Sequence, residues 1–165
     1  MDHTFYLEKL RLAAAEVAEE KPDYNGLKLS VDIVLESAAL KMYKPEWSSN
    51  PQSPIDAAGR IFFSIWISDK TLSEKKICYN IHALKLRELK AYKIAARNFA
   101  QDFRDEFLKY QEDWPNISVK YGPLTLMEGW VELNEDNIPQ AVAQLIRKFL
   151  KINSIVDTVL IQYKK

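Results

Sequence analysis

Three residues able to take part in chemistry alternate along residues 76–84, which read KICYNIHAL. If this segment is a strand, Cys78, Asn80 and His82 share the face opposite the apolar residues. Cys78 and His82 would then lie about 13 Å apart, at roughly 3.3 Å per residue, which is too far for a thiol to pass its proton to an imidazole. We therefore interpret Cys78 as a small buried apolar residue and His82 as a histidine held by a backbone or cross-strand partner.

A second polar row is expected along residues 124–133, where Glu128, Trp130 and Glu132 alternate. Glu128 and Glu132 would lie about 13 Å apart, beyond the roughly 6.5 to 9.5 Å that separates the two carboxylates of inverting glycosidases. Either could still act with a residue of another strand. Gly129 inside this strand indicates a bend in a twisted sheet, a bulge, or a backbone that another group approaches closely, and we favour the bend.

These rows predict a ligand site if the strands that carry them are neighbours. Trp66 lies between Ser64 and Ser68 on its own strand face, and the register of a hairpin could place it beside Asn80 and His82. The hypothesis is a pocket for a small planar or sugar-like ligand, lined by Trp66, Asn80, His82, Glu128 and Trp130. The same side chains could instead fill the interior of a second layer, closed by the loop around Trp47 or by the first helix.

The motifs of common enzyme classes are missing. Four scattered glycines form no phosphate or dinucleotide loop, no Gly-x-Ser-x-Gly elbow is present, and two histidines with one cysteine show no metal-ligand spacing. We predict no catalytic residue, no metal site and no cofactor, and favour a non-enzymatic binding or protein-interaction module whose partner is another protein or a small molecule. The alternative is an enzyme or enzyme-associated subunit with its site at His82, Asn80 and Glu128.

Charge is segregated along the chain, although its 23 basic residues balance its 23 acidic ones. Residues 70–97 hold eight Lys or Arg and two Glu, whereas residues 111–138 hold six acidic residues and one Lys. Such segments attract each other if the fold makes them neighbours.

The basic segment gives a second alternative, a nucleic-acid-associated protein. On a helix the spacing of four cations would form a basic stripe able to contact phosphates, made of Lys90, Lys93, Arg97 and Arg104. We do not favour nucleic acid as a partner, because acidic residues at 102, 105 and 106 dilute half of that stripe.

Length and composition predict one ordinary globular domain over residues 1–165. Hydrophobic residues make up 47%, and four Gly with seven Pro are too few for a disordered or collagen-like chain. No apolar run approaches the roughly 18 residues of a membrane span, the first residues do not resemble a secretion signal, and a single cysteine allows no internal disulfide. We expect a cytoplasmic protein with no membrane partner.

The apolar periodicity predicts an α+β fold in the order α-β-β-β-β-α-β-β-α-α. Helices are expected where apolar residues recur every three or four positions, at 4–20, 88–111, 138–149 and from Ser154 onward. Strands are expected where they alternate, at 27–35, 38–42, 61–68, 76–84, 117–121 and 124–133. A turn or bulge near Glu36 would separate the first two strands, and a helix over 31–39 is the competing interpretation.

The strands are expected to pair as hairpins in an antiparallel sheet of about five to six strands with helices on one face. A polar turn at 69–75 would join one pair, and Gly122-Pro123 another. Residues 44–59 form the one long loop, in which Trp47 is expected to anchor the loop to the core rather than to contact a partner. The other sheet face would be free to carry the predicted pocket.

Overall fold

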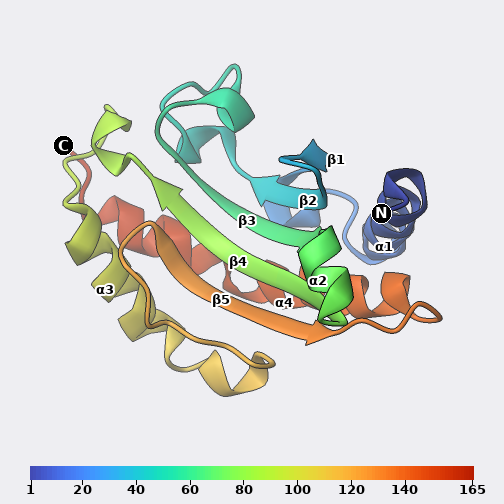
Figure 1. The fold of residues 1–165 in the computed structure, drawn as a ribbon. Coiled ribbons are helices and arrows are strands. Elements are labelled where there is room, and N and C mark those ends of the chain that lie inside the picture. Colours follow the sequence, from blue (N-terminus) through green and yellow to red (C-terminus); the bar gives the residue numbers. More distant parts are fainter.

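Five antiparallel strands and four helices make up the computed structural model, which describes residues 1–165 (Figure 1). The strands lie in one sheet in chain order: β1 (Lys28–Val34), β2 (Ser37–Tyr43), β3 (Arg60–Ile67), β4 (Lys76–Leu84) and β5 (Thr125–Glu132). The helices are α1 (His3–Glu20), α2 (Asp69–Ser73), α3 (Ala96–Phe107) and α4 (Ile138–Ile161). The predicted α+β class is confirmed. No helix is long and apolar enough to span a membrane.

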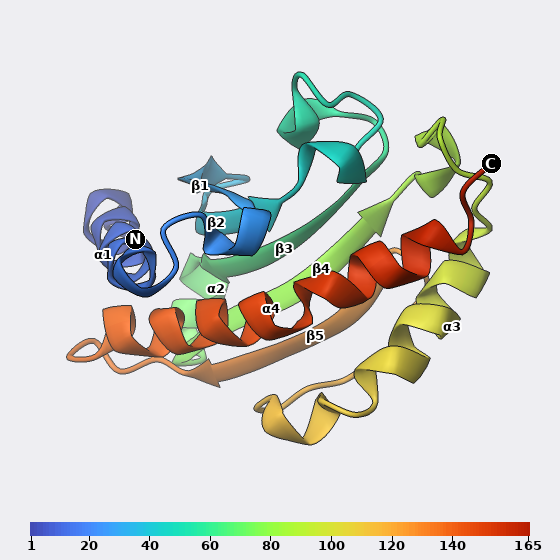
Figure 2. The same ribbon diagram turned by 180° about the vertical axis from the view of Figure 1, so that it is seen from behind.

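The three long helices cover one face of the sheet. Figure 2 shows α4 running along this face, with α1 beside its first half and α3 beside its second half. On the opposite face only the short α2 lies at one end of β3 and β4 (Figure 1). We call this second surface the open face.

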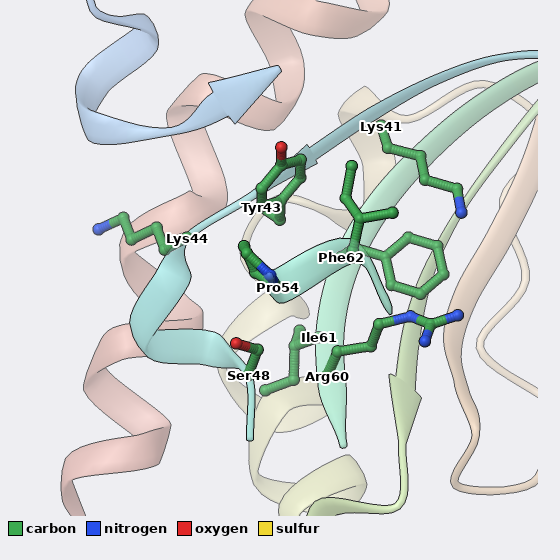
Figure 3. A pocket seen from close by; sticks show the side chains of 9 residues that line it. Lys41, Tyr43, Lys44, Ser48, Pro54, Arg60, Ile61 and Phe62 are labelled. Carbon is green, nitrogen blue, oxygen red and sulfur yellow. The ribbon is translucent and has the colours of Figure 1, made fainter. Parts of the chain in front are cut away.

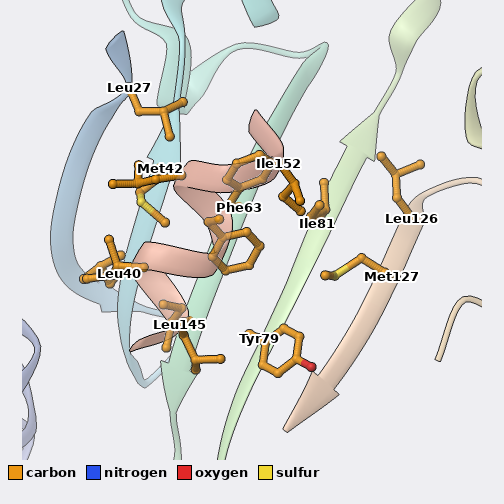
Figure 4. Packing of buried hydrophobic residues seen from close by; sticks show 14 of the residues in the cluster. Leu27, Leu40, Met42, Phe63, Tyr79, Ile81, Leu126, Met127, Leu145 and Ile152 are labelled. Atoms are coloured by element: carbon orange, nitrogen blue, oxygen red, sulfur yellow. The ribbon is translucent and has the colours of Figure 1, made fainter. Parts of the chain in front are cut away.

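The core lies between the sheet and α4. Every second side chain of β3 and β4 points toward the helices, and the Phe63 ring stacks on Phe149 of α4 with ring centroids 4.7 Å apart (Figure 4). Tyr79 and Ile81 of β4 are likewise fully buried. Burial of each large apolar side chain stabilises the fold by about 1.5 to 3 kcal/mol. Because side chains alternate along a strand, the intervening side chains of β3 and β4 then point to the open face.

A two-residue turn separates β1 from β2, as the shift in alternation predicted. Leu35 and Glu36 both have positive φ, 49° and 68°, and Val34 pairs with Ser37 across the turn. Two successive left-handed residues match the twist of the flanking strands. The competing helix over 31–39 is therefore wrong.

Trp47 anchors the long loop between β2 and β3, as expected. Its side chain is fully buried and packs against Phe63, with ring centroids 5.5 Å apart. Its indole N–H donates a hydrogen bond of 2.8 Å to Asp157 of α4. Thus the loop is fixed to the core although it contains only two short 3-10 turns.

The predicted helix over 88–111 begins eight residues late, because α3 spans only Ala96–Phe107. Residues before it follow another path: Lys85 is left-handed, and Leu86 and Leu89 are buried around a 3-10 turn. The Lys93 amide then donates to the Tyr163 carbonyl at 2.8 Å. Contacts with the end of the chain therefore override the helical periodicity.

The predicted strand at 117–121 and the hairpin at Gly122-Pro123 are also wrong. Ser118 forms only an isolated bridge with Glu128, although both of its backbone hydrogen bonds to that residue are short, 2.9 and 3.0 Å. Arg104 of α3 explains the loss, because its guanidinium donates to four carbonyls in this region, those of Tyr121, Gly122, Thr125 and Leu126. Together with a bond from the Asn116 side chain to the Trp130 carbonyl, the Ser118 bridge covers the outer edge of β5.

Two further boundaries differ from the prediction. A single helix, α4, replaces the two expected at 138–149 and from Ser154, because the buried stripe continues through Val156 and Val159 without a Gly or Pro. The expected polar turn at 69–75 contains the short helix α2, which Ser68 and Thr71 begin with a reciprocal capping box. Neither difference changes the face on which the polar rows lie.

Candidate functional site

The strand register brings the five predicted site residues onto the open face. Asn80 of β4 pairs with Ser64 of β3 on one side and with Glu128 of β5 on the other. In the next row Cys78 lies between Trp66 and Trp130. Cys78, Asn80 and His82 therefore share one face, as their alternation predicted.

Asn80 joins His82 and Glu128 in one hydrogen-bond network. Its amide nitrogen lies 3.1 Å from a Glu128 carboxylate oxygen and 3.1 Å from His82 Nε2. The carboxylate oxygen accepts, which fixes the amide nitrogen as the donor and therefore makes His82 Nε2 an acceptor. The other atom of the amide, Asn80 Oδ1, is buried and has no partner. An unpaired buried acceptor costs about 1 to 3 kcal/mol, so this network is held at some expense to stability.

His82 is held as a neutral imidazole by its surroundings. With Nε2 accepting, Nδ1 carries the proton and points to the Leu124 carbonyl at 3.4 Å. Burial lowers the pKa of His82 below its ordinary value, and the positive charges of Lys41 and Arg60 lower it further, against the opposing effects of Leu124 and Glu128. The Leu124 carbonyl is a backbone partner of the kind that was expected for His82, whereas its second partner, Asn80, lies on the same strand and not across from it.

This lowered pKa predicts a pH dependence of stability. Below about pH 6.5 the unfolded chain binds a proton at His82 that the folded protein resists, so the free energy of unfolding falls as the pH drops. We expect His82→Gln to lose part of this fall when urea denaturation at pH 7.5 and at pH 5.5 is compared. Equal losses in the two proteins would contradict the assignment.

Cys78 is a thiol at neutral pH. Burial raises its pKa to about 11, and the charge of Glu128 contributes to the increase. The half-buried Cys78 side chain is small, and its strand partners on either side are the two large residues Trp66 and Trp130. Cys78 was expected to be buried, but it is only half-buried and lines the α2 hollow.

Gly129 is approached closely by another side chain, so the favoured bend is wrong. Its partner across the strands is Tyr79, and a Cβ on Gly129 would lie 2.3 Å from the Tyr79 hydroxyl oxygen. The irregularity between β4 and β5 lies elsewhere, between Ile81 and His82. Gly129 is therefore required on the core side and has no direct part in the open face.

Two adjacent hollows mark the open face. The central hollow has a volume of about 320 Å³ and is lined by residues that include Lys41, Arg60, Phe62, Trp66, Asn80 and His82. The α2 hollow, of about 450 Å³, is lined by residues that include Trp66, Lys70, Lys76, Cys78, Glu128 and Trp130. Trp66 belongs to both. The predicted site residues are thus divided between two hollows that meet at Trp66, and the Asn80–Glu128 hydrogen bond connects them.

Lys41, Arg60 and Phe62 are members of the central hollow that the sequence hypothesis missed. The Lys41 ammonium lies 4.7 Å and the Arg60 guanidinium 5.3 Å from the centroid of the Phe62 ring. Figure 3, a view of the adjoining small pocket, shows both side chains on the same side of the sheet with this ring between them. The alternation of Leu40 and Met42 did place Lys41 on the polar face, but its approach to Phe62 depends on the β2–β3 register.

The proposed basic stripe does not form on one helix. Lys90 and Lys93 lie before α3, and Lys90 is near Glu88 at 3.5 Å. Arg97 is exposed on α3, whereas Arg104 is engaged with backbone carbonyls. The basic and acidic segments are instead neighbours, since Lys76 of β4 pairs with Glu132 of β5.

No group of three or more His, Cys, Asp or Glu side chains is placed to hold a metal ion. No family model, curated protein or solved structure matches this chain.

Proposed function

We propose that this chain is a non-enzymatic binding protein that holds a small ligand with a flat face on the open face of its sheet. The observation that carries the proposal is the meeting of two hollows at Trp66, beside the fixed polar network of Asn80, His82 and Glu128. Ligand sites commonly combine such a concave surface with a few fixed polar groups.

Aromatic rings supply the flat contact surface. The half-buried Trp66 lines both hollows, and the half-buried Trp130 lines the α2 hollow. Rings of this kind bind flat ligands by stacking or by edge contacts, and they add area at a small entropic cost because few torsions are lost. The half-buried Glu128 carboxylate then provides an acceptor next to Trp66 and Trp130, which would orient a ligand that carries an N–H or O–H group.

Binding is favoured over catalysis because the reactive groups are already engaged or inactive. The pKa of Cys78 is raised to about 11, so the thiolate nucleophile is scarce at neutral pH. Both ring nitrogens of His82 have partners within the protein. The enzyme alternative rests on the same Asn80, His82 and Glu128 network, and turnover of a bound compound would favour it.

The tryptophans allow a direct test. Trp47 and Trp114 are 0% and 4% exposed, whereas Trp66 and Trp130 lie half-buried on the open face. In Trp130→Phe, acrylamide quenching reports mainly Trp66, and in Trp66→Phe it reports mainly Trp130. We expect some compounds of a library of flat metabolites to protect Trp66 from quenching, since they would cover its ring.

Thermal denaturation supplies a second readout. A compound that protects Trp66 should also raise the melting temperature, because it binds only the folded state. We expect Trp66→Ala to lose that increase, while Tyr110→Ala, a half-buried aromatic of the segment after α3, should keep it. A library in which no compound changes the quenching of Trp66 or Trp130 would contradict the proposed function.

A further inference from the structure

We infer that the ligand of the central hollow is a small organic anion, a carboxylate or a phosphate monoester, whose charged group lies between Lys41 and Arg60. This inference rests on the proposed function and specifies the chemical class of its ligand. It follows from the partners that these two cations have and from those that they lack.

Lys41 and Arg60 converge on one ring from two neighbouring strands. Lys41 is on β2, Arg60 begins β3, and each cation lies within 5.3 Å of the centroid of Phe62, which is itself buried. Figure 3 shows the two side chains reaching past this ring to the same side. Both cations also line the central hollow, so a negatively charged group bound there would be attracted by both.

No acidic side chain forms a salt bridge with either cation. The salt bridges of the protein pair other groups, for example Lys44 with Asp157 at 2.6 Å and Arg147 with Glu16 and Glu20 at 3.0 and 2.7 Å. Asp56 is the one carboxylate whose charge acts on Lys41, and its side chain accepts a hydrogen bond from Ser53. Half-buried cations are usually paired, so this unpaired couple is distinctive.

Arg60 has unused donors. One nitrogen donates to the Ala57 carbonyl at 2.6 Å, while Nε is buried and has no acceptor. A guanidinium has five N–H donors arranged to match a carboxylate or a phosphate, and the Ala57 carbonyl is the one acceptor that the protein supplies to this side chain, so its terminal N–H groups can bind an anion.

The electrostatics of the hollow agree with an anionic ligand. Burial and the charge of Arg60 together lower the pKa of Lys41, and both cations lower the pKa of His82. The three basic groups therefore disfavour one another's charge in the free protein. A bound anion would offset that repulsion, and the low polarity around Phe62 would strengthen the attraction.

Four probes with one aromatic body separate charge from shape. They are 2-naphthoate, 2-naphthyl phosphate, the neutral 2-naphthylmethanol and the cationic 2-naphthylmethylamine, titrated calorimetrically at low salt. We expect the two anions to bind at least about tenfold more tightly than the alcohol, which corresponds to about 1.4 kcal/mol, and the amine to bind weakest. The carboxylate and the phosphate together show which anion the hollow prefers.

Variants locate the anionic group. Lys41→Met and Arg60→Met should each weaken anion binding about tenfold and leave the alcohol almost unchanged. Lys9→Met is the matched control, because the Lys9 ammonium also lies over a ring, 5.0 Å from the centroid of Phe5, but on α1 and outside both hollows. It should leave the affinity for all four probes unchanged. Circular dichroism checks folding, and if Arg60→Met does not fold, Lys41→Met and the four-probe comparison still decide.

The outcomes distinguish this inference from the proposed function. Equal affinity for anions and alcohol, or anion affinity that Lys41→Met leaves unchanged, would overturn the inference while the hollow remained a binding site. A wild-type protein that binds none of the four probes, although a library compound protects its Trp66, would also overturn the inference. Failure of every compound to affect the quenching of either Trp66 or Trp130 would overturn the proposed function itself.

Discussion

Replacing Trp47 by alanine is expected to lower the free energy of unfolding by about 3 to 5 kcal/mol. The indole is fully buried, packs against Phe63, and donates to one oxygen of the Asp157 carboxylate at 2.8 Å. The other oxygen of Asp157 accepts from Lys44 at 2.6 Å. The substitution would therefore create a cavity and remove the main attachment of the loop at residues 44–59 to α4.

Urea denaturation followed by circular dichroism measures this loss without relying on tryptophan emission. Trp47→Phe keeps an apolar ring but no N–H donor, so its cost should be smaller, about 1 to 2 kcal/mol. Trp130→Phe, on the open face, should cost less than either. A loss below about 1 kcal/mol for Trp47→Ala would show that the loop is not held by this residue.

Replacing Gly129 by alanine is expected to lower the free energy of unfolding by about 3 kcal/mol. The added Cβ would lie 2.3 Å from the Tyr79 hydroxyl oxygen and 2.6 Å from Cζ of the same ring. Tyr79 is fully buried and donates to the Pro115 carbonyl at 2.5 Å, so the ring has no free space into which it could move. A single methyl group must therefore displace a core aromatic or break its hydrogen bond.

Gly122→Ala is the matched control, because a Cβ at that position would meet no atom within 4 Å. We expect its stability to stay within about 0.5 kcal/mol of the wild type in the same urea experiment. Tyr79→Phe removes the atom nearest the new methyl group, so the double variant Gly129→Ala with Tyr79→Phe should cost less than the sum of its single changes. Full additivity would mean that the contact is relieved in some other way.

The strands that could be predicted from the sequence are those whose alternation is enforced by the core. Residues 76–84 match β4, and residues 61–68 match β3 within one residue, because every second side chain of each lies against α4. The segments at 88–95 and 117–121 could not be predicted. A backbone amide of the first segment donates to the distant Tyr163 carbonyl, and a backbone carbonyl of the second accepts from the Arg104 guanidinium. The local apolar periodicity does not indicate such long-range contacts.

The candidate site likewise contains some residues that the sequence could place and others that it could not. The alternation along a single strand predicted that Asn80 and His82 lie together, because side chains two residues apart share a face. The alternation could not predict that Lys41 and Arg60 both lie near Phe62, because that depends on the register between β2 and β3. For Gly129 the close approach depended on the reach of the Tyr79 ring across to β5, which no spacing in the sequence encodes.

The covered edge of β5 has a consequence for self-association. The Ser118 bridge and the Asn116 side chain occupy backbone groups of Glu128 and Trp130 that would otherwise be free to recruit a strand from another molecule. The other edge strand of the sheet is β1. There the Asp32 carboxylate accepts a hydrogen bond from the Ile33 amide at 2.8 Å, so this amide is not free to pair with another strand. Pairing of this sheet with a strand of a second molecule is therefore more accessible at β1, where it would meet the charges of Lys28 and Asp32.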